Sequence, residues 1–109
     1  MAMDLPTLRK LVALDANDPL SRFALGRKLF ESEPTPGVLI EAADHLLFAN
    51  ANAPDHLATY HILGQVLMRL DRKDEARRVL EEGVRRTASI GEGMGRDLAP
   101  AMRELLQSL

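Results

Sequence analysis

The chain has 109 residues, of which 46% are hydrophobic, so it can build one domain with a real core and wholesale disorder is disfavoured. Its net charge of -2 argues against a general nucleic-acid binder, because such proteins normally carry a basic surplus. The absence of cysteine excludes disulfides, thiolate metal sites and cysteine nucleophiles.

The first residues, MAMDLPTLRK, contain no apolar stretch behind a basic one, so we expect no secretory signal. No apolar run approaches the roughly 18 residues that a membrane-spanning helix needs. We therefore expect a soluble, cytoplasmic protein that does not act on membranes.

Proline, aspartate, asparagine and glycine divide the chain into about six predicted helices. No segment alternates apolar and polar residues for long enough to predict a strand. The first helix is expected at about Leu5–Leu14, with Asp4 as its N-cap. A second helix should begin after the cap Asp18, with Pro19 at its first position, and reach about Glu31.

The turn-rich segment ESEPTPG separates the second helix from the third. Thr35 is the predicted N-cap of the third helix, which should extend to about Asn50. After the break NANAP, a fourth helix is expected from about Pro54 or Asp55 to Leu70.

Asp71 is the predicted N-cap of a fifth helix, which should extend to about Ala88. The glycine-rich IGEGMG, Ile90–Gly95, is expected to be a flexible connector. A last helix is predicted within residues 96–109, with Asp97 as its N-cap. The predicted fold class is therefore all-α.

The second and fourth helices share a pattern centred on glycine, and the helices that follow them share a spacing of small residues and a leucine. The offset between equivalent residues is 38 in the first helix of each pair and 34 in the second, so four extra residues lie around ESEPTPGV. The equivalent residues are Arg22 and Tyr60, Leu25 and Leu63, Gly26 and Gly64, Leu29 and Leu67, Ala42 and Ala76, Leu46 and Leu80, and Ala49 and Gly83.

This pattern resembles the tetratricopeptide repeat (TPR) family, in particular its small, bacterial-type members with two repeats. The family pattern is an aromatic residue, Leu-Gly and a large residue, then an alanine with a large residue four positions later, and a closing proline. The second unit has Tyr60 as its aromatic residue but Ala88 where the proline would stand. The first unit has Arg22 in place of the aromatic residue and closes at Pro54.

The resemblance implies antiparallel helical hairpins stacked in a short right-handed superhelix. We expect a single domain with an N-terminal helix at 1–17, a first repeat with an insertion at 18–54, a second repeat at 55–88 and a C-terminal capping helix at 96–109. The apolar residues expected to cover the two ends are Leu5, Leu8, Leu11, Val12, Leu14, Leu98, Met102, Leu105 and Leu106.

A glycine within a helix costs about 1 kcal/mol relative to alanine, so two such glycines need an explanation. Small residues let two helix backbones approach closely. We therefore expect Gly26 to face Ala42 or Ala43 of its hairpin, and Gly64 to face the stretch around Ala76.

In TPR proteins the first helix of each pair lines a concave groove that binds peptides. The resemblance therefore implies a partner-binding groove formed by Phe23, Arg27, Phe30, His61, Gln65, Met68 and Arg69. Alternatively, Phe23, Phe30 and Met68 simply pack on the terminal helices. Some TPR proteins clamp the carboxylates of chaperone tails, but the corresponding Phe23, Arg27 and Ile62 lack that polar set.

Other chemistry finds no support in the sequence. The histidines His45, His56 and His61 have no metal-binding spacing, and no phosphate-binding glycine loop or catalytic triad is recognisable. We therefore expect no metal, no cofactor and no catalysis. Three acid–arginine pairs, Asp74–Arg78, Glu81–Arg85 and Glu82–Arg86, predict a solvated face on the fifth helix.

The expected function is that of an adaptor that binds a protein or peptide, as a monomer or weak homo-oligomer. The alternative is a homo-oligomeric structural protein whose terminal helices exchange between chains.

Overall fold

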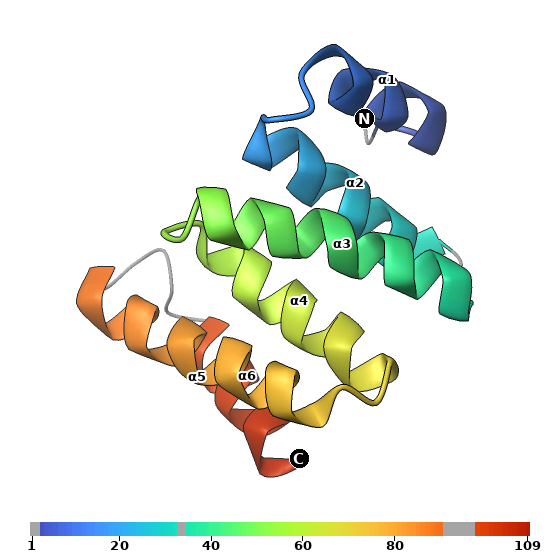
Figure 1. The fold of residues 1–109 in the computed structure, drawn as a ribbon. Helices are drawn as coiled ribbons and strands as arrows, with labels where there is room; N and C mark the ends of the chain where they lie inside the picture. Colours follow the sequence, from blue (N-terminus) through green and yellow to red (C-terminus); the bar gives the residue numbers. More distant parts are fainter. Residues whose placement is uncertain (1–2, 33–34, 91–97) are drawn as a thin grey trace. The chain divides into compact units, whose positions relative to one another are not determined.

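The computed structural model describes residues 3–32, 35–90 and 98–109 (Figure 1). Within these residues the chain forms six α-helices and no strand, which confirms the all-α prediction. The helices are α1 (Leu5–Leu14), α2 (Pro19–Ser32), α3 (Pro36–Asn52), α4 (Leu57–Arg69), α5 (Lys73–Ile90) and α6 (Leu98–Gln107).

The helices belong to two compact units, Met1–Ala53 and Pro54–Leu109. In the first unit α2 packs along α3, and α1 packs on α2 (Figure 1). In the second unit α4 packs along α5, and α6 contacts both (Figure 1). Each unit is therefore a helical hairpin with one additional helix, which comes first in one unit and last in the other.

Three predicted N-caps are confirmed. The Asp4 carboxylate accepts a hydrogen bond from the Thr7 amide at 3.0 Å, and the Thr35 hydroxyl accepts one from the Val38 amide at 3.3 Å. Asp18 accepts from the amide two residues further along, at 3.2 Å. Each bond satisfies an amide that would otherwise have no partner in the first turn of a helix, so these residues fix where α1, α2 and α3 begin.

The prediction that Asp71 caps α5 is wrong, because Asp71 ends α4 instead. Its φ angle is 59°, in the left-handed region. Its amide donates to the Met68 carbonyl at 3.0 Å, and the Arg72 amide donates to the Leu67 carbonyl at 2.9 Å. These two bonds define a Schellman C-cap, a motif that usually places glycine at the left-handed position. Aspartate is among the few other residues that tolerate this conformation.

Several helix ends differ from prediction by one to three residues. α2 extends to Ser32, α3 to Asn52 and α5 to Ile90, while α4 begins at Leu57 instead of residue 54 or 55. The predicted cap Asp97 and most of IGEGMG lie outside the described residues.

Each hairpin brings its glycine against a leucine of the opposite helix. A Cβ atom added at Gly26 would lie 2.7 Å from Leu46 Cγ and 3.2 Å from the Ala42 carbonyl oxygen. A Cβ added at Gly64 would lie 2.7 Å from Leu80 Cγ. Since Cβ atoms essentially never come within 3.0 Å of such neighbours, both positions require glycine for this packing.

The atoms nearest to a Cβ at Gly64 belong to Leu80, one turn further along α5 than the expected Ala76. Ala76 is fully buried but is not among the nearest neighbours. The expected approach of Gly26 to Ala42 is confirmed, although Leu46 is closer. The glycine has no side chain, and the leucine side chain of the opposite helix packs into the space this leaves. The contact is therefore between a glycine and a large residue, and not between two small residues.

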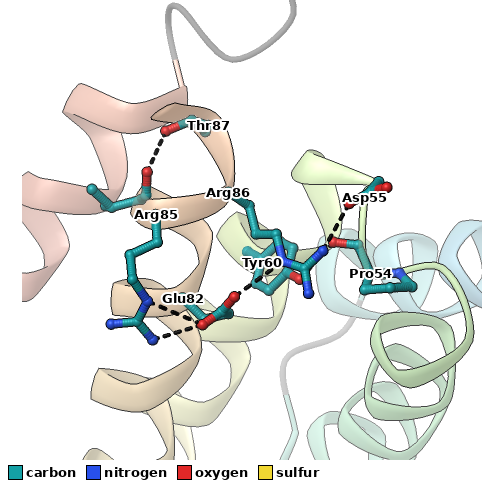
Figure 2. Close-up of polar contacts among 8 residues, drawn as sticks. Pro54, Asp55, Tyr60, Glu82, Arg85, Arg86 and Thr87 are labelled. Atoms are coloured by element: carbon teal, nitrogen blue, oxygen red, sulfur yellow. Dashed lines mark hydrogen bonds and ion pairs between the residues drawn. The ribbon is translucent and has the colours of Figure 1, made fainter. Parts of the chain in front are cut away.

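A second contact also recurs in the two hairpins. The Arg22 guanidinium donates through Nε to the Ala16 carbonyl at 2.8 Å, and the Tyr60 hydroxyl donates to the Pro54 carbonyl at 2.6 Å (Figure 2). Both bonds span six residues. Arg22 also lies 4.3 Å from the centroid of the Phe48 ring. The arginine therefore makes the same backbone contact as the tyrosine, and its aromatic neighbour is on the facing helix.

Helix α6 docks on the second hairpin through Met102. Met102 is fully buried together with Tyr60 and Leu80. A Cβ atom at Gly83 would lie 2.6 Å from Met102 Sδ and 2.7 Å from Tyr60 Cβ, so the glycine makes room for both side chains. The expected covering role of α6 is thus observed within its own unit.

Helix α1 covers its unit less completely than predicted. Leu8 is buried, and Arg9 makes a two-pronged ion pair with Glu41 of α3, at 2.6 and 3.2 Å. Leu14, however, is 83% exposed and covers nothing in its unit. It is the last residue of α1 and lies next to the turn into α2.

Candidate functional site

The expected groove residues lie on the first helix of each hairpin. Phe23, Arg27 and Phe30 are on α2, and His61, Gln65, Met68 and Arg69 are on α4. Arg27 and Arg69 are exposed, whereas the other five are partly buried. Each helix therefore presents both apolar and polar side chains at positions that solvent reaches.

The first unit has an open hollow of about 240 Å³ where α1 packs on α2. We call it the α1/α2 hollow. It is lined by Met3, Leu8, Phe23, Ala24, Arg27, Lys28 and Glu31.

The α1/α2 hollow combines apolar lining with compensated charges. Leu8 is only 4% exposed, and the partly buried Phe23 also lines the hollow. Arg27 Nε pairs with Glu31 at 3.2 Å. The pKa of Asp4 is lowered first by hydrogen bonds from Thr7 and further by the positive charge of Lys28. Both cations therefore already have an acidic side chain nearby.

The second unit has an open hollow of about 270 Å³ between α4 and α6. We call it the α4/α6 hollow. It is lined by Gln65, Met68, Arg69 and Leu105. Met68 and Leu105 also pack against the buried cluster of Tyr60, Leu80 and Met102, so the apolar lining continues into the core.

Among the described residues, Gln65 hydrogen-bonds only within its own helix, and both bonds are long. Its amide nitrogen lies 3.3 Å from the His61 carbonyl and 3.4 Å from His61 Nε2. Burial lowers the pKa of His61, which favours the neutral ring. A neutral ring nitrogen can accept from the glutamine, so His61 positions Gln65 at the edge of the hollow.

Five of the seven expected groove residues line one of these two hollows. Phe30 and His61 line neither. Met68 serves both as core packing and as hollow lining, so the two interpretations raised by the sequence apply to it together.

Both hollows include residues that sequence reasoning did not assign to a site. Leu8 and Met3 come from α1 and the residues before it, Lys28 and Glu31 from α2, and Leu105 from α6. The available signal was the amphipathic character of the terminal helices, which favoured a covering role. A helix that covers a hairpin also forms one wall of a hollow. Which of its side chains line that wall depends on how the helix packs, and the sequence pattern does not show this.

A polar network ties the three helices of the first unit together. His45 Nε2 lies 3.3 Å from Glu41 Oε2, and His45 Nδ1 lies 3.4 Å from Arg22 Nη1. The hydrogen bond from Arg9 is the main cause that lowers the pKa of Glu41. Among the described residues, no three His, Asp or Glu side chains come together as a possible metal site. The network joins α1, α2 and α3.

Acidic side chains pair with the arginines near the end of α5. Arg86 donates to Glu82 at 3.0 Å and to Asp55 at 2.8 Å (Figure 2). Arg85 pairs with Glu82 at 2.6 Å and not with the predicted Glu81 (Figure 2). The predicted Glu82–Arg86 pair is confirmed.

Near the start of the same helix, Asp74 pairs with Arg77 at 3.3 Å and not with the predicted Arg78. Arg72 pairs with Glu75 at 2.7 Å. Partners three residues apart on a helix are as close as partners four apart, so a shift of one residue between them costs little. Mixed and largely paired charges fit a solvated surface.

The comparisons with known proteins add no family. No protein-family model matches the chain, and neither a curated protein nor a solved structure matches it. Over the described parts of the chain, no helix combines the length and apolarity needed to cross a membrane. The geometry of the two hollows is therefore the basis for inferring a function.

Proposed function

We propose that the protein is a non-catalytic, TPR-like binding module that holds a peptide or protein partner against α2 and α4. The observation that carries the proposal is that Phe23, Arg27, Gln65, Met68 and Arg69, expected to bind a partner, line open hollows in the two units.

The side-chain chemistry of both hollows suits peptide capture. Each has a large apolar side chain beside an arginine: Phe23 with Arg27, and Met68 with Arg69. Aromatic residues, methionine and arginine are enriched in the central parts of protein interfaces. An apolar anchor supplies most of the binding free energy, while polar groups at its edge fix the orientation of the partner.

Two repeated contacts support a TPR-like scaffold. Gly26 with Leu46 corresponds to Gly64 with Leu80, and the six-residue bond of Arg22 corresponds to that of Tyr60. The stacking of the hairpins in a right-handed superhelix stays a prediction.

The proposal includes a cytoplasmic location and a protein partner in place of nucleic acid or membrane. The net charge of -2 and the acid-paired arginines of α5 disfavour a nucleic-acid partner. No cofactor or metal is needed for such a role.

The test is affinity capture followed by reconstitution with the purified captured protein. Wild type is compared with Arg27→Glu/Gln65→Glu, which changes one lining residue in each hollow. The matched control is Arg77→Glu/Gln107→Glu, which makes the same chemical changes at exposed positions outside both hollows. Melting curves of all three proteins show whether a loss of binding reflects a loss of folding.

The proposal predicts that the hollow variant binds the purified partner at least tenfold more weakly, while the control binds like wild type. Equal binding by the hollow variant and the wild type would place the interaction elsewhere and contradict the proposal.

The second candidate function is self-association through the first unit. The observation that favours it is the exposure of large apolar side chains near α1: Leu14 is 83% exposed, Leu20 54% and Met3 51%. Sedimentation over a wide concentration range separates the candidates. A dimer that dissociates on Leu14→Asp would support self-association, and a monomer throughout would exclude it.

A further inference from the structure

Helix α1 forms one wall of the α1/α2 hollow. Leu8 lines the hollow from α1, and Met3 lines it from the residues before the helix. The other lining residues, Phe23 and Arg27 among them, belong to α2. A movement of α1 away from α2 would therefore open the hollow and expose the α2 residues that line it.

A small apolar contact attaches α1 to its hairpin. Leu8 is the one buried residue of this helix, whose residues are all described. Leu14 is 83% exposed, and the apolar residues between these two, Leu11 and Val12, are only partly buried. Among the described helices of its unit, α1 packs on α2 and not along α3. An element with so few buried apolar contacts can open locally at low free energy.

Helix α6 is anchored more deeply in the second unit. Met102 is fully buried with Tyr60 and Leu80, and its sulfur occupies the space that a Cβ atom at Gly83 would need. In addition, α6 packs on both helices of its hairpin. The two terminal helices therefore differ, and α1 is the one that can detach at low cost.

A two-pronged ion pair joins α1 to α3. Arg9 Nη1 and Nη2 donate to the two carboxylate oxygens of Glu41, at 2.6 and 3.2 Å. The two side chains are 50% and 36% exposed, so both charges stay in contact with water when the pair breaks. Dissolved salt also weakens such an exposed pair. The bond between α1 and α3 can therefore form and break without burying a charge.

The acceptor of this ion pair has a second partner within the hairpin. Glu41 Oε2 lies 3.3 Å from His45 Nε2, and His45 Nδ1 lies 3.4 Å from Arg22 Nη1. Because a guanidinium only donates, Nδ1 accepts, and Nε2 carries the hydrogen that Glu41 receives. Glu41 therefore keeps a contact on the α2–α3 hairpin when Arg9 leaves, and the hairpin can retain its structure.

We propose that α1 is a lid on the α1/α2 hollow, that the Arg9–Glu41 ion pair is its latch, and that the lid opens while α2 and α3 stay folded. The closed lid covers part of the α2 lining, and the open lid exposes that lining to a partner. The inference rests on the proposed function, because it specifies how access to this binding surface is controlled.

Hydrogen exchange of the free protein, followed by NMR, tests the lid. Protection factors of the amides from Leu8 to Leu14 in α1 are compared with those of amides in the middle of α2 and α3. The variant that breaks the latch is Arg9→Gln. The matched control is Arg27→Gln, which breaks an equally exposed pair with Glu31, at 3.2 Å within α2.

We expect the wild-type α1 amides to be at least tenfold less protected than those of α2 and α3. Arg9→Gln should lower α1 protection by about fivefold, the upper end for an exposed ion pair, because the pair is two-pronged. Protection of α2 and α3 should not change, and Arg27→Gln should leave α1 as in wild type. Raising the salt concentration to about 0.5 M should lower α1 protection in wild type but hardly in Arg9→Gln.

Equal protection of α1, α2 and α3 in wild type would show that α1 opens only when the whole unit unfolds, and it would overturn the inference. An α1 protection that Arg9→Gln leaves unchanged would overturn it as well. Both results leave the proposed function standing. The proposed function fails separately, in the reconstitution experiment, if the purified partner binds the hollow variant as it binds wild type.

Discussion

Replacing Gly64 by alanine tests the close approach of α4 and α5. The new Cβ atom would lie 2.7 Å from Leu80 Cγ. Leu80 is fully buried in the cluster with Tyr60 and Met102, so it cannot move aside into solvent. Overpacking of this kind costs about 1–3 kcal/mol, whereas alanine gains about 1 kcal/mol in helix propensity over glycine.

The expected balance is a loss of up to about 2 kcal/mol of unfolding free energy. For a chain of this size, each kcal/mol corresponds to roughly 4 °C in melting temperature, so Gly64→Ala should melt up to about 8 °C lower than wild type. Thermal unfolding followed by circular dichroism at 222 nm is a suitable assay for an all-α protein.

Gly37→Ala is the matched control. Gly37 also lies in a helix, but an added Cβ would meet nothing within 4 Å. This variant should melt at the wild-type temperature or slightly above it. If Gly64→Ala instead melted clearly above the wild-type temperature, the close contact with Leu80 would not exist as described.

A double-mutant cycle identifies the atoms responsible. Leu80→Ala removes the Cγ and Cδ atoms that the new methyl group would meet, at a cost of about 2–5 kcal/mol. In that background Gly64→Ala should no longer be destabilising. The two substitutions should therefore couple favourably by about 1–3 kcal/mol. Additive effects would show that the cost arises elsewhere.

Three further changes test individual contacts. Asp71→Gly should raise the unfolding free energy by up to about 1 kcal/mol in urea titrations, because glycine adopts a φ of 59° more easily; a lower value would contradict the C-cap. Tyr60→Phe should cost about 1 kcal/mol in the same assay, because it removes the hydroxyl bond to the Pro54 carbonyl; an unchanged value would mean that this bond contributes nothing. Hydrogen bonds, chiefly from Ser21 to Asp18 and from Arg9 to Glu41, lower the pKa of each carboxyl below its ordinary value of 3.8 or 4.5. The stability that these carboxylates confer is present above their ordinary pKa values and is lost as the pH falls through the lowered pKa values. Urea titrations should therefore give a smaller unfolding free energy at pH 3 than at pH 7. Equal unfolding free energies at the two pH values would contradict the assignment.

Much of the fold was predictable because its signals are local. The caps Asp4, Asp18 and Thr35 each act on amides within three residues, so their roles are visible in the sequence. Asp71 was assigned wrongly because an aspartate between two helices suits either the end of one or the start of the next. The backbone conformation decides between these roles, and composition does not reveal it.

The candidate site was predictable only in part, because a hollow has two walls. The wall from α2 and α4 followed from the repeat pattern, which fixes the helix faces. The other wall, with Leu8 on α1 and Leu105 on α6, depends on how each terminal helix docks. That docking is set by contacts distant in sequence, such as Met102 at Gly83, and the repeat pattern does not contain them.

Hydrogen–deuterium exchange of the reconstituted complex tests the central claim most directly. With the purified partner bound, the account predicts slower exchange in peptides covering α2 and α4, and unchanged exchange along the charged face of α5. Protection confined to α5, with α2 and α4 exchanging as in the free protein, would contradict binding at the two hollows.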